Sequence, residues 1–216
     1  MMFGYLFISE LLSLIPGNIG AGPMQNIGAY GVELKDVFYE LEAIEIDSGN
    51  SVKFIATDCN FGYRESVFKN KYRDKFIITS VTLRLNKVPK FNTSYGAIEQ
   101  ELERMGVKEL SIAAVSKAVC NIRSSKLPDP AQIGNAGSFF KNPVISAELY
   151  QKIKSEFPDV VAYQASPPAP LQKEREDMKL AAGWLIEQCG WKGYRKDDFG
   201  VHKNQALVLV NYGNAN

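Results

Sequence analysis

The sequence predicts a two-part α+β protein, and three observations lead to this fold class. A run rich in β-branched and aromatic residues over 37–46 indicates strands in the first part. Apolar residues at helical spacing over 98–122 indicate helices in the second part. Between them, the polar segment 88–94 carries a proline and separates the two textures. We therefore expect a first part of residues 1–90 and a second part of residues 91–216.

The first part is expected to contain a hairpin and a further strand. The turn-forming residues 47–50 join the strand over 37–46 to a second one over 52–55. Apolar and polar residues then alternate over 77–86, which is typical of a half-buried strand. One face of this strand would carry Ile77, Thr79, Val81, Leu83 and Leu85.

The second part is expected to open with two helices whose apolar stripes pack in the core. The prolines of 126–130 end the second of these helices. The remaining elements are expected in this order: a helix capped by Ser146 and stopped by Pro158, a strand over 160–163, a proline-rich loop over 164–171, a helix over 179–189 with Gly190 after it, and a last strand over 206–210.

Composition restricts the class of protein. The chain has 216 residues, of which 45% are hydrophobic and 23% charged, so it can bury a core in one large or two small domains. With 25 basic and 24 acidic residues it has no overall field that would attract nucleic acid or a membrane surface. The three cysteines are widely spaced and the chain has a single histidine, which argues against disulfides or a zinc site and favours a reducing, cytoplasmic location.

The N-terminal segment is apolar over residues 1–12, which raises the question of a signal peptide or a membrane anchor. No basic leader precedes the apolar run, Glu10 interrupts it, and Pro16 ends it short of the roughly 20 residues that a membrane span needs. We therefore expect a buried helix here.

A glycine-rich loop follows over residues 17–31, with five glycines in fifteen positions. Bare backbone of this kind can bring N–H groups against a phosphate or a flat ring. The loop matches neither G-x-G-x-x-G nor a P-loop, which argues against a Rossmann or P-loop nucleotide site. From these residues alone, a ligand-binding loop and a purely structural crossing point remain open.

Ser138 lies in a second segment of small residues, 134–143. Glycines on either side of Ala136 permit a tight turn, which could bring the Ser138 hydroxyl to hydrogen-bond distance of a ligand. An ordinary turn leading into a strand is the alternative, and these ten residues alone favour it. Arg64 lies in a compact aromatic and polar segment, 59–69, where the alternative to a functional role is a surface ion pair with Glu65 or Asp74.

Taken together, these segments resemble one family. Residues 15–31, 61–69 and 126–143 look like motifs of the UDP-N-acetylenolpyruvoylglucosamine reductase (MurB) family, in the family's order. The likeness extends from about Leu12 through 181–186 and 201–208. It implies that residues 1–90 are the remnant of an FAD-binding domain of the vanillyl-alcohol-oxidase type and that residues 91–216 form the substrate-binding domain.

The resemblance implies a flavoenzyme of peptidoglycan synthesis. In the family, NADPH reduces bound FAD, and hydride then passes to the enolpyruvyl double bond of a UDP-sugar to give UDP-N-acetylmuramate. The intermediate is an enolate, which needs a positive charge beside it and a proton on the neighbouring carbon. By resemblance, Arg64 supplies the charge and Ser138 the proton.

The resemblance also implies two sets of binding residues. FAD would lie against Ile15, Gly20, Ala21, Met24 and Gly28. The UDP-sugar would contact Tyr63, Tyr95, Arg123, Lys126 and Asn142. Tyr95 would belong to a loop that closes over the substrate, with a core-packed aromatic as the alternative. We expect His202 to support the fold rather than the chemistry.

The sequence departs from the family pattern at both ends. Nothing before Leu12 resembles the family's first glycine-rich phosphate loop, and the chain stops before the closing strand whose glutamate assists proton delivery. Three interpretations follow: a reductase that works only at full length, an inactive product or non-catalytic UDP-sugar-binding module, and an unrelated α+β interaction domain. The oligomeric state stays open.

Overall fold

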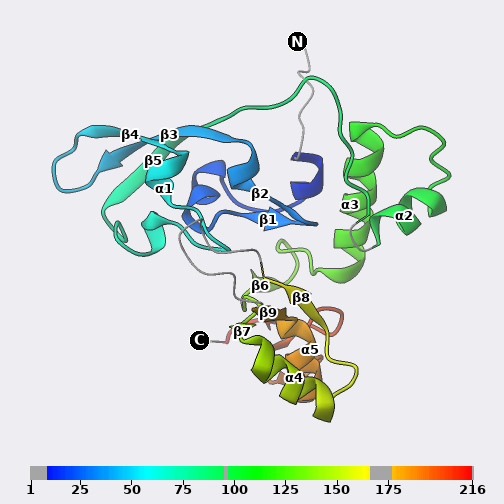
Figure 1. Ribbon diagram of the computed structural model, residues 1–216. Coiled ribbons are helices and arrows are strands. Elements are labelled where there is room, and N and C mark those ends of the chain that lie inside the picture. Colours follow the sequence, from blue (N-terminus) through cyan, green and yellow to red (C-terminus); the bar gives the residue numbers. More distant parts are fainter. Residues whose placement is uncertain (1–8, 95–96, 166–176, 216) are drawn as a thin grey trace. The chain divides into compact units, whose positions relative to one another are not determined.

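The computed structural model describes residues 9–94, 97–165 and 177–215 (Figure 1). Helices and strands occur together in each of two compact units, Met1–Arg123 and Ser124–Asn216, which we call unit 1 and unit 2. The mixed content confirms the α+β prediction. The units divide within helix α3, later along the chain than residue 90. The assignment of residues 1–90 to an FAD-binding domain and of residues 91–216 to a substrate-binding domain therefore stays a prediction.

Unit 1 is built on a three-stranded antiparallel sheet in the order β4-β3-β5. Strands β3 (Phe38–Glu45) and β4 (Ser51–Ile55) form the predicted hairpin, and β5 (Phe76–Leu83) pairs with the other edge of β3 (Figure 1). The turn between β3 and β4 is closed by the Ser48 hydroxyl, which donates to the Glu45 carboxylate at 2.6 Å. The hairpin prediction is therefore confirmed.

The alternation predicted for β5 is wrong in its first half. Ile77 is 58% exposed, whereas its neighbour Ile78 packs against the core of the sheet. The cause is an irregularity in the pairing of β3 with β5 between Glu42 and Ala43, where β5 contains an extra residue. Because side chains alternate strictly along a strand, one inserted residue switches the core-facing set.

Two apolar cores stabilise unit 1. The first lies under the sheet, where Phe54 makes edge contacts with the rings of Phe68, Tyr72 and Phe76 at 5.1 to 5.8 Å between centroids. The second joins helices α2 (Ile98–Arg104) and α3 (Ile112–Lys126), whose predicted apolar stripes are buried as expected. Leu11 and Val32 belong to this second core, so the helices and the beginning of the chain fold together.

The described N-terminal residues form a single 3₁₀ turn, η1 (Ser9–Leu12), rather than a longer helix. Glu10 and Leu11 in this turn are buried, as predicted for the segment. Residues 1–8 of the expected helix lie outside the described part of the chain. Among the described residues, no helix is both long and apolar enough to cross a membrane.

The glycine-rich loop and the five residues after it fold into short elements. They are η2 (Ile19–Ala21), η3 (Pro23–Gln25), β1 (Gly28–Ala29), β2 (Val32–Glu33) and η4 (Leu34–Asp36). Strands β1 and β2 pair around a two-residue turn, Tyr30-Gly31, in which both residues have positive φ. Helix α1 (Ala56–Cys59) and η5 (Val67–Lys69) flank the segment that carries Arg64.

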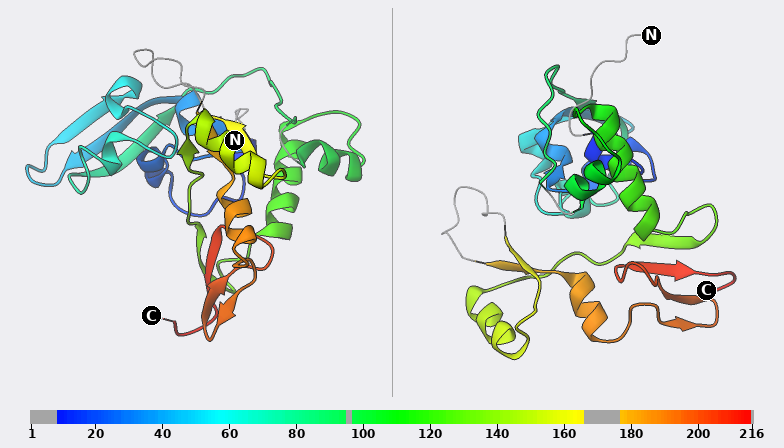
Figure 2. Two further views of the ribbon diagram at one scale, coloured as in Figure 1. Left: turned by 60° about the horizontal axis from the view of Figure 1, so that its bottom comes forward. Right: turned by 90° about the vertical axis from the view of Figure 1, so that its right-hand side faces the viewer.

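The described residues of unit 2 contain two small antiparallel sheets and, after the end of α3, two helices. One sheet has the order β10-β11-β12-β6, and in Figure 2 its orange and red strands lie side by side. The other has the order β7-β9-β8. The bounds are β6 Gly134–Ser138, β7 Val144–Ile145, β8 Ala162–Gln164, β9 Met178–Leu180, β10 Arg195–Lys196, β11 Phe199–Val201, β12 Val208–Asn211, α4 Ala147–Glu156 and α5 Ala182–Gln188.

Most sequence predictions for unit 2 are confirmed. Ser146 caps α4, since its hydroxyl accepts from the Leu149 N–H, and Pro158 follows the end of that helix. Gly190 has φ +75° after α5, where a left-handed residue completes the helix end. The predicted helix over 179–189 begins only at Ala182, because Met178–Leu180 pair with β7 and β8. Residues 166–171 of the predicted loop lie outside the described residues.

Candidate active site

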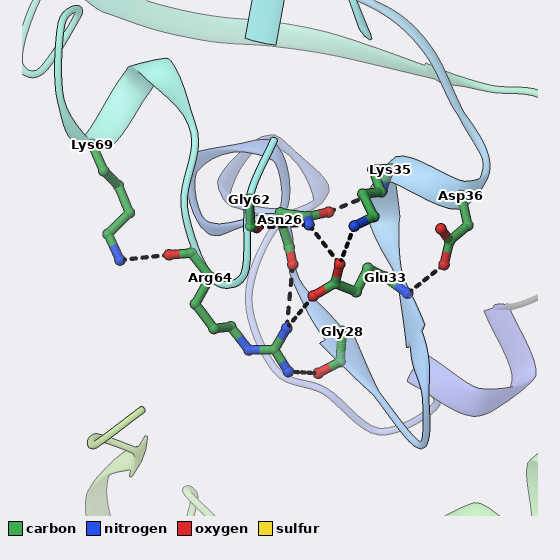
Figure 3. Close-up of polar contacts among 8 residues, drawn as sticks. All are labelled: Asn26, Gly28, Glu33, Lys35, Asp36, Gly62, Arg64 and Lys69. Atoms are coloured by element: carbon green, nitrogen blue, oxygen red, sulfur yellow. Dashed lines mark hydrogen bonds and ion pairs between the residues drawn. The ribbon is translucent and has the colours of Figure 1, made fainter. Parts of the chain in front are cut away.

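Arg64 lies in a narrow loop of unit 1 that the paired residues Gly62 and Glu65 close. Its φ is +55°, a left-handed conformation that non-glycine residues adopt infrequently. The Lys69 ammonium donates to the Arg64 carbonyl oxygen at 3.0 Å and so holds the backbone of the loop from outside (Figure 3). Strained backbone of this kind persists only where surrounding contacts determine it.

The Arg64 guanidinium is bound by the glycine-rich loop (Figure 3). Its Nη2 donates to the carbonyl oxygen of Gly28, and its Nη1 donates to the carbonyl oxygen of Asn26 at 3.4 Å. Nη1 also lies 3.4 Å from Glu33 Oε1, which completes an ion pair with both side chains largely buried. The side chain is therefore fixed against the segment that the sequence predicted to hold flavin.

The ion-pair alternative named Glu65 or Asp74 as partners of Arg64, and this part of the prediction is wrong. Asp74 instead pairs with Arg73 at 3.6 Å, and Glu65 accepts from the Asn70 side chain at 3.1 Å. Glu33 comes from β2, far from Arg64 in the sequence but adjacent to it in the fold. Spacing along the chain could not reveal this partner.

Asn26 links the glycine-rich loop to the Arg64 loop. Its side chain is fully buried, with Nδ2 donating to Glu33 Oε2 at 3.0 Å and to the Gly62 carbonyl at 2.9 Å. Its Oδ1 accepts from the Lys35 backbone N–H at 3.0 Å. Asn26 itself has φ +42°. One amide group thus joins three segments around Arg64.

The predicted site residues Tyr63 and Met24 also lie in this part of unit 1. The Arg64 guanidinium carbon lies 5.2 Å from the centre of the Tyr63 ring, which is a cation–π distance. Ser66 donates to the Met24 carbonyl at 2.7 Å and ties the Arg64 loop to η3 a second time. Of the residues proposed from sequence, the structure brings together Met24, Gly28, Tyr63 and Arg64.

Gly28 is required by packing within unit 1. A Cβ atom at this position would clash with the Val32 carbonyl oxygen and lie 3.0 Å from Arg64 Nη1. At Gly20 a Cβ would lie 3.3 Å from the Ile78 carbonyl oxygen, a tighter contact than usual. These two glycines therefore have a structural explanation, and their role against a cofactor stays a proposal.

Residues 14–24, which include the first part of the glycine-rich loop, expose apolar side chains. Leu14, Ile19 and Met24 are 58%, 57% and 44% exposed, Ala21 is exposed, and Ile15 is half-buried. Exposed large apolar side chains close together in a chain are typical of surfaces that meet a ligand or another protein. A flat, largely apolar ring system fits such a surface, because small residues let it approach the backbone and the apolar side chains cover it.

Ser138 ends strand β6 at the edge of a sheet in unit 2, where a turn was expected. It pairs with Val208, and the register shifts before it, next to Gly137 with φ +60°. The following N–H, that of Phe139, donates to the Leu207 carbonyl at 3.0 Å. Among the residues that the structure describes, the Ser138 hydroxyl is exposed and makes no hydrogen bond. The backbone fixes the direction of Ser138, and its hydroxyl is open to a ligand.

Lys126 and Asn142 each have neighbours in unit 2. Lys126 ends α3, and the buried His202 side chain lies beside its backbone. The Asn142 Oδ1 accepts from the Ala182 N–H at 2.9 Å, at the start of α5. Asn142 thus satisfies the first N–H of α5 from outside the helix, and its amide nitrogen makes no hydrogen bond within the described residues.

Arg123 and Tyr95 complete the predicted substrate set. Arg123 lies near the end of α3, half-buried, and its Nε has no hydrogen-bond partner in the described part of the chain. Tyr95 lies outside the described residues. Within those residues, no three His, Cys, Asp or Glu side chains lie close enough to hold a metal ion. The convergence of Arg64 and Ser138 on one substrate stays a prediction.

Comparisons with known proteins point to one family. The family described as UDP-N-acetylenolpyruvoylglucosamine reductase, C-terminal domain, matches residues 129–216. The UDP-N-acetylenolpyruvoylglucosamine reductase of Pseudomonas syringae pv. syringae is 54% identical over 206 residues, covering 95% of this chain and 58% of the relative. The protein of the same name from Amoebophilus asiaticus is 52% identical over 212 residues, covering 98% and 60%.

A solved structure shares the fold. The crystal structure of UDP-N-acetylenolpyruvylglucosamine reductase (MurB) from Thermus caldophilus matches with a TM-score of 0.58 and 23% identity, covering 95% of this chain and 54% of that chain. The chain spans 58 to 60% of the length of the two curated relatives above.

Proposed function

Because the chain belongs to the UDP-N-acetylenolpyruvoylglucosamine reductase family, we propose that it takes part in the NADPH-dependent, FAD-mediated reduction of UDP-N-acetylglucosamine-enolpyruvate to UDP-N-acetylmuramate. This reaction would place the protein in peptidoglycan synthesis, in the cytoplasm. The identity of 54% over 206 residues to a protein of that name supports the proposal.

One structural observation carries the proposal: the Arg64 guanidinium is fixed to the carbonyl oxygens of Asn26 and Gly28 in the glycine-rich loop. A cation held at the edge of a loop with exposed apolar side chains suits a reaction in which negative charge develops beside a flat ring. A surface ion pair alone would not need two backbone acceptors and a left-handed residue.

The exposed apolar surface of the loop fits FAD, with Ile15, Gly20, Ala21 and Met24 proposed to lie against it and Gly28 beside them. When bound, FAD would supply the hydride for the double bond, with NADPH as the donor. Arg64 would then stabilise the negative charge that moves toward the substrate carboxylate, and its fixed position means that no reorganisation is needed as the charge forms.

Ser138 is proposed to donate the proton to the carbon next to the one that receives hydride. Serine is a weak acid, so this transfer needs the hydroxyl at hydrogen-bond distance from the intermediate in a site without bulk water. The Ser138 hydroxyl is exposed and its backbone is fixed by pairing with β12, so a bound substrate can come within hydrogen-bond distance of it. The same substrate would cover the hydroxyl and exclude bulk water.

The UDP-sugar is proposed to contact the side chains that the family resemblance names for it. The Tyr63 ring, already packed against Arg64, would cover a flat or sugar surface, and Arg123 and Lys126 would meet the diphosphate. The Asn142 amide nitrogen and Tyr95 are proposed to add further contacts. Each of these four described side chains can be tested singly.

The test measures flavin binding, nucleotide-sugar binding and turnover separately. The purified chain is incubated with FAD and examined for bound flavin absorbance, and binding of UDP-N-acetylglucosamine-enolpyruvate is measured by calorimetry. Turnover is assayed in a chimera in which the 206 matching residues replace those of the Pseudomonas syringae relative. We expect reduction of the UDP-sugar by the chimera and its loss on Arg64→Met.

The outcomes separate the alternatives. Sugar binding without flavin binding or turnover would replace the proposal with a non-catalytic UDP-sugar-binding module. An inactive chimera that binds neither ligand would overturn both.

A further inference from the structure

Glu33 is the point at which the polar contacts around Arg64 meet (Figure 3). Its Oε1 faces Arg64 Nη1 at 3.4 Å. Its Oε2 accepts from Asn26 Nδ2 at 3.0 Å and pairs with the Lys35 ammonium at 2.8 Å. Two donors thus hold one oxygen of the carboxylate, and the other oxygen is left to face Arg64.

The backbone of Glu33 is held as well. Its N–H donates to the Asp36 carboxylate at 2.8 Å, in a capping box at the start of η4. The Glu33 side chain is only 20% exposed. Its rotamer is therefore determined by the loop around it and not by Arg64, so that the carboxylate can act as a fixed support.

An arginine side chain needs such a support. It has several rotatable bonds, and ordering it costs on the order of 2 kcal/mol of rotamer entropy. The two carbonyl acceptors fix where the guanidinium lies, but both are single-point contacts from neighbouring residues of one loop, Asn26 and Gly28. A third contact from a charged group on a different element, β2, restrains rotation about the Nε–Cζ bond.

The guanidinium keeps donors for a ligand. Arginine has five N–H groups, and the contacts described above involve only Nη1 and Nη2. Within the described residues, Nε has no hydrogen-bond partner. An anion approaching from the open side would meet these remaining donors on a group that cannot turn away.

We propose that Glu33, held by Asn26 and Lys35, is a positioning residue that keeps the Arg64 guanidinium in the orientation needed to stabilise the anionic intermediate. This inference rests on the function proposed above, and it assigns Glu33 no contact with substrate. It predicts that removing the charge of Glu33 frees the guanidinium without moving the backbone that carries it.

The direct test is the NMR signal of the Arg64 guanidinium in the 216-residue chain, identified by its absence in Arg64→Lys. A restrained guanidinium gives separate Nη signals, and a freely rotating one gives a single averaged signal. We expect separate signals in the unmutated chain and an averaged one in Glu33→Gln. Separate signals that persist in Glu33→Gln would overturn the proposal, as would an averaged signal in the unmutated chain.

Glu40→Gln is the matched control. Glu40 lies in the same unit on β3, has a side chain 27% exposed and pairs at 3.3 Å with Lys53, which lies on β4 and not in the glycine-rich loop. Its substitution should leave the Arg64 signals unchanged. If Glu33→Gln does not fold, Glu33→Asp takes its place, because it keeps the charge but withdraws the carboxylate by one methylene. We expect an averaged Arg64 signal in this variant as well. Separate signals in Glu33→Asp would then overturn the proposal.

A second arm measures turnover in the chimera. Because misplacing a catalytic group by about 1 Å can cost on the order of 10²-fold in rate, we expect Glu33→Gln to lower kcat about 10- to 100-fold with little change in KM. In an Arg64→Lys background the same substitution should change kcat less than about twofold, because the group to be positioned is gone. Equal losses in both backgrounds would contradict the positioning role. A chimera with no turnover would defeat the proposed function, and the NMR arm would still decide whether Glu33 positions Arg64.

Discussion

Arg64 and Ser138, the two residues proposed to carry out the chemistry, have opposite surroundings. In unit 1 the Arg64 side chain is bound by two backbone carbonyls and a carboxylate, and its own carbonyl by a lysine. In unit 2 the Ser138 hydroxyl is exposed and, among the described residues, unbonded, and only strand pairing fixes its position. A long, charged side chain loses its function when it can rotate, whereas a serine has a single side-chain torsion and needs only a fixed backbone.

The difference teaches where substitutions near each residue should act. Around Arg64, substitutions of the residues that contact its side chain should lower both the stability of unit 1 and the rate of the reaction. The same contacts hold the glycine-rich loop and the Arg64 guanidinium. Around Ser138, only the residue itself should matter for the rate, and the fold should tolerate its change.

The largest effect is expected for Ser138→Ala. General acid catalysis contributes typically about 10²- to 10⁴-fold, so reduction of the UDP-sugar by the chimera should fall by that factor. Reduction of the flavin by NADPH should stay largely unchanged, which stopped-flow absorbance can measure. Ser155→Ala, at an exposed serine in α4, is the control. Equal loss of both half-reactions would refute the role of Ser138 as the proton donor.

Asn26→Ala should cost the most stability. It removes the donor of the Gly62 carbonyl and the acceptor of the Lys35 N–H in a fully buried place, and it leaves a non-glycine residue at φ +42°. We expect a loss of about 2–4 kcal/mol in the free energy of unfolding, measured by urea denaturation. Asn70→Ala, which removes an exposed amide that donates to the Glu65 carboxylate and to the Ser66 carbonyl, should cost about 1 kcal/mol or less. Comparable losses in the two variants would show that Asn26 does not link the loops.

Gly28→Ala tests whether the backbone that binds the Arg64 guanidinium can accommodate an added methyl group. The new methyl group would press on the Val32 carbonyl and on Arg64 Nη1, so β1 or the guanidinium must move. We expect a loss of about 1–3 kcal/mol, as for overpacking in a core, together with averaged Arg64 signals by NMR. Gly62→Ala, where the nearest atom is 3.5 Å away, should retain separate signals. A Gly28→Ala variant with unchanged stability and signals would contradict the packing described here.

The comparison also shows what sequence can reveal about such a site. Periodicity placed the hairpin and both apolar helix stripes, because each follows from neighbours close in the chain. The glycine-rich loop and Arg64 were found from composition and family resemblance. Glu33 was not singled out, because its partners Asn26 and Arg64 come from other segments of the chain. For Asn26, the amide group within the glycine-rich loop was visible in the sequence as a donor and acceptor, whereas its burial is visible only in the structure.

The smallest effect is expected from a change of pH, which should lower the stability of the two units in different pH ranges. Burial, followed by the charge of Lys203, lowers the pKa of His202 below its ordinary value, whereas hydrogen bonds from Arg104 and Asn121 lower the pKa of Glu101 in unit 1 to about 2. Both groups bind protons more readily when unfolded, so stability is full above the unfolded pKa and is lost as pH falls. For His202 the loss begins below about pH 6.5, and for Glu101 only below about pH 4.5.

Unit 2 should therefore weaken first on acidification. Both tryptophans, Trp184 and Trp191, lie in unit 2, so their fluorescence reports that unit, while circular dichroism reports both. In urea titrations from pH 7 to 5, we expect the fluorescence midpoint to fall more than the dichroism midpoint. His202→Gln should remove this difference. If the two midpoints fall together in the unmutated chain, His202 does not control the acid unfolding of unit 2. The predicted difference in acid stability between the two units would then be wrong.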